Sequence, residues 1–195
     1  MNTIIFATNN ENKIYEVESL VGDQYDILSL KAAGIDLDIP EPHRTLEENA
    51  REKSKTIYNL TGKDCFSEDT GLEIKALRGE PGVISARYAG DHKSSADNIA
   101  KVLKLLAGNT NRKACFRTVI SLMMNGTEHQ FEGVCEGNIS ELEKGSAGFG
   151  YDPIFIPEGS VNTFGEMTLD EKNTFSHRKK AIAQLLAFLS LHGNV

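Results

Sequence analysis

The segment of six residues that follows the first apolar stretch contains hydrogen-bond donors that could bind a phosphate group. Residues 3–7 form a short predicted strand, which leads through Thr8-Asn9-Asn10-Glu11-Asn12-Lys13 into a predicted helix near residues 11–21. A helix N-terminus carries unpaired N–H groups and about half a positive charge, so Lys13 in the first turn is unfavourable by about 0.3–1 kcal/mol. A bound anion would remove this conflict. The alternative is an ordinary Asn/Thr helix cap with a solvated Lys13.

Acidic residues at two places could supply a metal ligand and a general base. Glu68 and Asp69 follow a short buried strand predicted at residues 63–67, where α/β proteins often place reacting groups. Mg²⁺ typically takes one or two carboxylates together with substrate phosphates, and a nearby carboxylate can accept a proton from water. Glu41 lies between two prolines in a stiff loop and could reach the same ion. The alternatives are an acidic turn at residues 68–71 and a solvated Glu41.

A predicted helix carries two further polar candidates. It begins at the capping box Thr45-Leu-Glu-Glu48, runs to about Leu60 and ends at Gly62. Asn49 and Lys53 are four residues apart and therefore share one face of this helix. They could contact phosphates, or they could be exposed polar positions.

Two segments near the C-terminus could recognise a base. Phe149 lies between two glycines in the segment 146–152, so its ring could stack on a purine, a contact worth about 1–3 kcal/mol. Lys172, His177 and Arg178 offer donors and almost no acceptors, which favours a 6-keto purine over a 6-amino one. The alternatives are a glycine-rich turn that buries its Phe and Tyr, and a solvated basic patch.

Bulk properties exclude several classes of protein. The 195 residues carry a formal charge of −7, which argues against a general nucleic-acid binder. The three scattered cysteines indicate reduced thiols and a cytoplasmic protein, without a signal peptide. No segment approaches the roughly 20 apolar residues of a membrane span. The sequence has no P-loop, zinc-binding pattern, dinucleotide fingerprint or nucleophile elbow.

The remaining pattern predicts an α/β protein with a mixed sheet. Asn125-Gly126 is a strong hairpin signal between strands predicted at residues 112–124 and 127–137. Further strands are expected at residues 72–77 and 154–156, and further helices near residues 95–107, 168–174 and 177–191.

Seven motifs, in order and at the usual spacing, resemble the inosine triphosphate pyrophosphatase family over nearly the whole chain. They are Ala7-Thr-Asn-Asn-x-x-Lys13, Glu48-Asn-Ala-x-x-Lys53, Glu68-Asp-Thr-Gly71, Pro81-Gly-Val-x-Ser-Ala-Arg-Tyr-Ala-Gly90, Phe149-Gly-Tyr-Asp-Pro153, Glu166-Met…Glu171-Lys-Asn173 and Ser176-His-Arg178.

The resemblance implies a single α/β domain over residues 1–195, with a long mixed central sheet flanked by helices and two lobes around a nucleotide-binding cleft. It implies a homodimer that uses Mg²⁺ to hydrolyse ITP, dITP and XTP to the monophosphate and pyrophosphate, with no nucleic-acid or membrane partner. Asp69 is then the expected general base, with Lys53 and Glu68 as further catalytic groups and Asp69, Glu41 and Glu68 as metal ligands. The expected substrate-binding residues are Thr8, Asn9, Asn10, Lys13, Asn49, Thr70, Phe149, Gly150, Tyr151, Asp152, Lys172, His177 and Arg178.

Two other functions remain open at this point. One is a house-cleaning pyrophosphatase for modified pyrimidine triphosphates, which would not need the donor cluster at residues 172–178. The other is a non-catalytic purine-nucleotide sensor, which would bind ITP and leave it intact.

Overall fold

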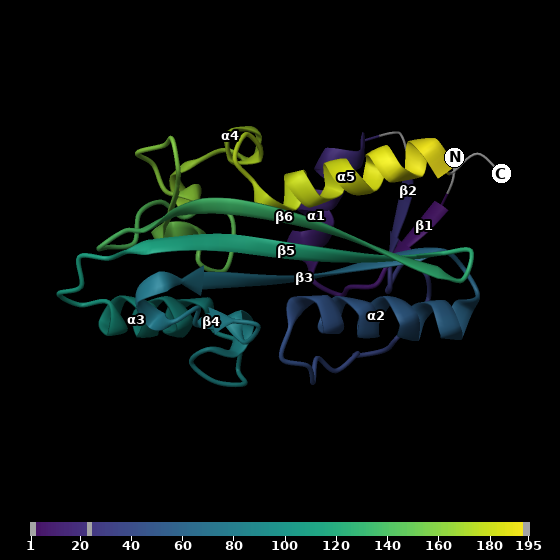
Figure 1. Ribbon diagram of the computed structural model, residues 1–195, viewed down its shortest axis with the longest axis horizontal. Coiled ribbons are helices and arrows are strands. Elements are labelled where there is room, and N and C mark those ends of the chain that lie inside the picture. The colour runs from purple at the N-terminus through teal and green to yellow at the C-terminus, as the bar shows by residue number, and fades with distance from the viewer. Residues whose placement is uncertain (1–2, 23–24, 193–195) are drawn as a thin grey trace. The chain divides into compact units, whose positions relative to one another are not determined.

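The computed structural model describes residues 3–22 and 25–192, and these residues form the predicted α/β fold with a mixed sheet flanked by helices (Figure 1). The strands are β1 Thr3–Phe6, β2 Asp26–Ser29, β3 Cys65–Ile74, β4 Pro81–Gly82, β5 Lys113–Met124, β6 Thr127–Ile139 and β7 Phe155–Pro157. The α-helices are α1 Glu11–Val21, α2 Leu46–Thr61, α3 Ser95–Leu105, α4 Leu169–Asn173 and α5 His177–His192. Short 3₁₀ turns occupy Lys75–Leu77, Ser85–Arg87, Asp152–Ile154 and Phe164–Glu166.

The strand order is β2-β1-β3-β5-β6-β7, and β4 pairs with β3. β1 runs parallel to β2 and β3, whereas β4 runs antiparallel to β3 and β7 antiparallel to β6. The chain divides into two compact units. Unit 1 comprises the chain up to Asp69, Thr118–Gly133 and the chain from Arg178, and unit 2 comprises Thr70–Arg117 and Val134–His177.

The core of unit 1 lies on both faces of β1, because alternate side chains of a strand point in opposite directions. Ile4 and Phe6 belong to one apolar cluster with residues of α1 and α5, and the Phe6 ring stacks on Phe66 with centroids 4.5 Å apart. Ile5 packs in a second cluster with Ile57 of α2. Both faces of β1 are therefore covered by helices, which holds its carboxyl end in place.

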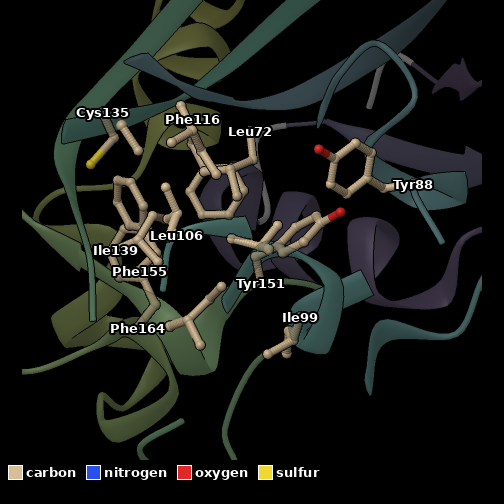
Figure 2. Packing of buried hydrophobic residues seen from close by; sticks show 14 of the residues in the cluster. Leu72, Tyr88, Ile99, Leu106, Phe116, Cys135, Ile139, Tyr151, Phe155 and Phe164 are labelled. Atoms are coloured by element: carbon tan, nitrogen blue, oxygen red, sulfur yellow. The ribbon is translucent and has the colours of Figure 1, made fainter. Parts of the chain in front are cut away.

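The core of unit 2 is one aromatic-rich cluster (Figure 2). Phe116 contacts Phe155 and Phe164, with ring centroids 4.7 and 6.2 Å apart. Figure 2 also shows Tyr88 and Tyr151, whose hydroxyl groups bring two oxygen atoms into this apolar cluster. The Tyr151 hydroxyl donates to the carbonyl of Ser85 at 2.7 Å.

Local signals predicted several elements correctly. Thr45 caps α2, its side chain accepting the N–H of Glu48, and Gly62 ends the helix in the left-handed conformation at φ 63°. Asn125 and Gly126 both have positive φ, 49° and 78°, as the two-residue hairpin between β5 and β6 requires. All three cysteines are free. Within the described residues, no helix is long and apolar enough to cross a membrane.

The bounds predicted for the strands at residues 63–67 and 72–77 were wrong, since one strand covers Cys65–Ile74 and Lys75–Leu77 is a 3₁₀ turn, and one strand was missed. Glu68 and Asp69 do not end a strand, because β3 continues without interruption from Cys65 to Ile74. Their polar character suggested a turn, but ion pairs and hydrogen bonds within unit 1 allow both carboxylates to be buried inside the strand. The edge strand β2 was not predicted at all; it has four residues and pairs with β1.

Candidate active site

The segment after β1 forms the predicted cap of α1. Asn10 is the N-cap, and its side-chain oxygen accepts the N–H of Lys13 at 3.2 Å. The Thr8 hydroxyl accepts the N–H of Asn10, and the Asn9 amide donates to the carbonyl of Leu37, both at 3.2 Å. Asn9 and Asn10 are exposed. The capping interpretation is thus correct, but Lys13 is not solvated.

Lys13 belongs to a buried charge network that we call the Arg178 network, formed by Lys13, Glu16, Glu68 and Arg178. The Lys13 ammonium lies 3.3 Å from Oε1 of Glu68. Arg178 donates from Nε and Nη2 to the Glu68 carboxylate at 2.8–3.0 Å, and from Nη1 to Glu16. The Arg178 and Glu68 side chains are 1% and 0% exposed.

The two cations of this network determine the charge state of Glu68. Burial alone would raise the pKa of its carboxyl, but the charges of Arg178 and Lys13 override burial and lower the pKa to about 2. Glu68 is therefore ionised at neutral pH, with its carboxylate directed to Arg178 and Lys13. The role of Glu68 as a metal ligand stays a prediction.

A second cluster in unit 1, which we call the Asp69 cluster, surrounds the neighbouring carboxylate and consists of Glu41, Asn49, Lys53 and Asp69. Asn49 donates to Oδ2 of Asp69 at 3.2 Å, and the Lys53 ammonium lies 3.6 Å from Oδ1. Lys53 also lies 2.6 Å from Oε1 of Glu41 and donates to the carbonyl of Glu68 at 2.8 Å. Asn49 and Lys53 do share a face of α2, and both are buried, so the exposed-residue alternative is wrong.

Burial also shifts the pKa of the Asp69 carboxyl. Removal from water raises the pKa of its carboxyl above the ordinary value, against the opposing charges of Lys53 and Lys13. A carboxyl with a raised pKa accepts a proton more readily than an exposed one, as a general base must. The arrangement is thus suited to withdraw a proton from water while cations neutralise nearby negative charge.

The oxygen atoms of the Asp69 cluster are suitable ligands for a hard divalent cation. Two carboxylates and a backbone carbonyl are oxygen ligands of the kind that Mg²⁺ prefers. In residues 3–22 and 25–192, no three His, Cys, Asp or Glu side chains come together as a metal site. An ion held by Glu41 and Asp69 would therefore take its other ligands from phosphates and water, which is the usual situation for Mg²⁺.

In unit 2, a buried ion pair holds the loop that carries Phe149. The Asp152 carboxylate accepts the N–H of Phe149 at 2.9 Å and the ammonium of Lys172 at 2.5 Å. Lys172 also lies 5.2 Å from the centroid of the Phe149 ring. Gly148 has φ +72° and leaves no space for a Cβ beside the Asp152 carboxylate. Phe149 is half-buried, so the loop presents part of its ring.

The other predicted residues of unit 2, and the basic residues at the start of α5, occupy varied positions. Tyr151 is buried in the core, and the ring of His177 stacks on Phe116 with centroids 4.7 Å apart. Thr70 on β3 and Gly150 are half-buried. The basic patch is not solvated as a whole: Lys172, His177 and Arg178 are buried, whereas Lys179 and Lys180 are exposed. The direct roles of these residues in base recognition stay predictions.

Sequence reasoning missed Glu16, and it noted Gly148 only as one of the two glycines beside Phe149. Glu16 interrupts no apolar pattern, and its partner Arg178 is 162 residues away, so no local signal could identify it. The positive φ of Gly148 and its contact with Asp152 depend on the folded loop, although a glycine three residues after another was visible.

Comparisons with known proteins agree with the motifs. The sequence model of the Ham1 family matches residues 4–188. A protein of Flavobacterium johnsoniae named dITP/XTP pyrophosphatase is 48% identical over 187 residues, 96% of this chain and 97% of its own length. One from Bacillus licheniformis with the same name is 41% identical and covers 97% of this chain and 98% of its own. The solved structure of the Staphylococcus aureus Ham1 protein has a TM-score of 0.89 at 38% identity, covering 98% of this chain and all of that one.

Proposed function

Because the chain belongs to the Ham1 family, we propose that it hydrolyses the non-canonical purine triphosphates ITP, dITP and XTP to the monophosphate and pyrophosphate. Relatives at 48% and 41% identity over nearly their full length carry the name dITP/XTP pyrophosphatase. The chain is accordingly a nucleoside-triphosphate pyrophosphatase, a hydrolase that removes such nucleotides from the pool.

The observation that carries a catalytic role is the Asp69 cluster. A buried carboxylate with a raised pKa lies beside an ammonium and an amide donor. In the proposed reaction, Asp69 takes a proton from a water molecule as the water oxygen bonds to phosphorus. The bond between the α-phosphorus and the bridging oxygen of the α–β anhydride breaks, and pyrophosphate leaves with that oxygen. No covalent intermediate is needed, because positioning and charge neutralisation lower the barrier.

We assign the triphosphate and the base to different residues. Thr8, Asn9, Asn10 and Lys13 would contact phosphate and sugar through their donors, with Lys13 already directed toward Glu68. Phe149 would stack on the base, Asp152 and Lys172 holding its loop. The direct readers of the keto oxygens would be Lys172, His177 and Arg178, two of which donate to carboxylates in this structure.

The family requires a divalent metal, and we propose that Mg²⁺ serves here. Glu41 and Asp69 would hold it, and the ion would neutralise charge on phosphate oxygens. We further propose a cytoplasmic homodimer, in keeping with the three free cysteines and the family resemblance. Sedimentation equilibrium would test the dimer: a mass of one chain at micromolar concentration contradicts it.

A substrate panel tests the function. Purified protein with Mg²⁺ should release pyrophosphate rapidly from ITP and XTP and only slowly from ATP. Faster release from dUTP than from ITP would favour a pyrimidine house-cleaning enzyme. Binding of ITP without any release would favour a nucleotide sensor.

A further inference from the structure

The ammonium of Lys53 lies at the point where the oxygens of the Asp69 cluster converge. Its Nζ is 2.6 Å from Glu41 Oε1, 2.8 Å from the Glu68 carbonyl oxygen and 3.6 Å from Asp69 Oδ1. These are the same oxygens that would hold a divalent ion. Lys53 and the ion are therefore candidates for one position.

The surroundings make Lys53 dependent on these oxygens. Its side chain is only 9% exposed, and a buried ammonium is tolerated when anions and hydrogen-bond acceptors replace water. Glu41 is 28% exposed, so one side of the position remains accessible to solvent. An ion could approach from that side while Lys53 occupies the other.

Asn49 holds Asp69 and the backbone of the neighbouring loop independently of Lys53. Asn49 donates to Asp69 at 3.2 Å, accepts the N–H of His43 at 2.9 Å and donates to the His43 carbonyl at 3.3 Å. Asn49 thereby ties Asp69 to the loop that carries Glu41, two residues before His43. Asp69 and the backbone of this loop should therefore stay in place when the ammonium leaves.

We propose that Lys53 is a displaceable internal cation that competes with the divalent metal for Glu41, Asp69 and the Glu68 carbonyl. This inference rests on the proposed function. In their ionised forms Glu41 and Asp69 carry two negative charges, of which the Lys53 ammonium balances one; a divalent ion added beside the ammonium would meet cation–cation repulsion. When a triphosphate arrives, its oxygens offer the ammonium a new partner, and the carboxylates become available to the metal.

The competition makes metal and phosphate binding interdependent. By thermodynamic reciprocity, a triphosphate that attracts Lys53 raises metal affinity, and a metal that displaces Lys53 raises triphosphate affinity. The free protein would thus hold metal weakly and the nucleotide complex would hold it tightly. Lys53 would couple the two ligands in addition to neutralising charge.

The test measures Mn²⁺ binding by isothermal titration calorimetry without nucleotide. Lys53→Met should bind Mn²⁺ about tenfold or more tightly than the wild type, within the usual range of such couplings. The matched control is Lys55→Met, which removes the same charge from an exposed position on the same helix, and it should stay within about twofold of the wild type. Adding Glu41→Gln to Lys53→Met should abolish the gain.

Equal or weaker Mn²⁺ binding by Lys53→Met would overturn the proposal, as would an equal gain in Lys55→Met. If Lys53→Met does not fold, Lys53→Gln keeps a neutral donor beside Glu41 and must show the same increase. Pyrophosphate release from ITP by the wild type is measured separately. Its absence would remove the proposed function and leave the Mn²⁺ comparison valid, whereas normal release with no gain in affinity would remove only the role of Lys53 as a competitor.

Discussion

Replacing Arg178 by methionine should destabilise the protein strongly at neutral pH. Arg178 is 1% exposed and pairs with both Glu68 and Glu16, so its removal leaves two buried carboxylates with Lys13, 3.3 Å from Glu68, as the remaining cation of the network. Removing one partner of a buried ion pair typically costs about 3–5 kcal/mol. For a chain of this size the melting temperature should fall by roughly 6–20 °C.

The dependence of this cost on pH gives a sharper test. In the wild type the pKa of Glu68 is lowered to about 2, so its stabilising effect is present above the unfolded value of 4.5 and is lost as the pH falls toward 2. The shift is worth about 3 kcal/mol. In Arg178→Met only Lys13 opposes the effect of burial, so the pKa of Glu68 should be higher than in the wild type, and protonation should cost the folded variant less. The difference between the two proteins should therefore shrink between pH 7 and pH 3.5.

The assay is urea unfolding in EDTA, which keeps divalent ions out of the comparison. The matched control is Arg51→Met, because Arg51 pairs with Glu128 at 2.8 Å but its side chain is 43% exposed. Its loss should cost less than about 1 kcal/mol. An Arg178→Met variant as stable as Arg51→Met, or a cost that is unchanged at pH 3.5, would refute the account of this network.

Three further predictions concern the base loop and the thiols. Phe149→Ala should lower kcat/KM for ITP roughly 5- to 150-fold, equivalent to about 1–3 kcal/mol of lost stacking, with an unchanged melting temperature; unaltered kinetics would remove Phe149 from the base site. Gly148→Ala should cost more stability than Gly150→Ala, because both glycines have positive φ but a Cβ at Gly148 alone displaces Asp152; equal melting temperatures would show that the loop adapts. Burial and nearby acids raise the pKa of Cys115 to about 11, two units above its ordinary value of 9.0, so at pH 8 it should react with DTNB about 100-fold more slowly than after denaturation, and equal rates would contradict this.

Local chemistry made parts of the fold predictable. The cap of α2 at Thr45 and the turn at Asn125-Gly126 depend on residues within three positions of one another, and both were confirmed. β2 and the continuity of β3 depend on distant partners. β2 gave no pattern of its own, and the buried charge of Glu68 is acceptable only because Arg178, 110 residues away, reaches it.

The sequence predicted which residues belong to the candidate site better than it predicted the contacts between them. Asn49 and Lys53 were expected on one face of a helix, and both lie near Asp69. The partners of Arg178 in the structure, Glu16 and Glu68, were not predicted. A sequence shows which groups can donate; the acceptors that they find depend on the whole chain.

Phosphorus NMR of the products formed from ITP and Mg²⁺ shows which phosphoanhydride bond is hydrolysed and whether Asp69 is needed as the base. The wild type should yield IMP and pyrophosphate in equal amounts, and folded Asp69→Asn should leave ITP intact. Formation of IDP and inorganic phosphate would show that a different bond is cleaved, and full activity in Asp69→Asn would exclude Asp69 as the base.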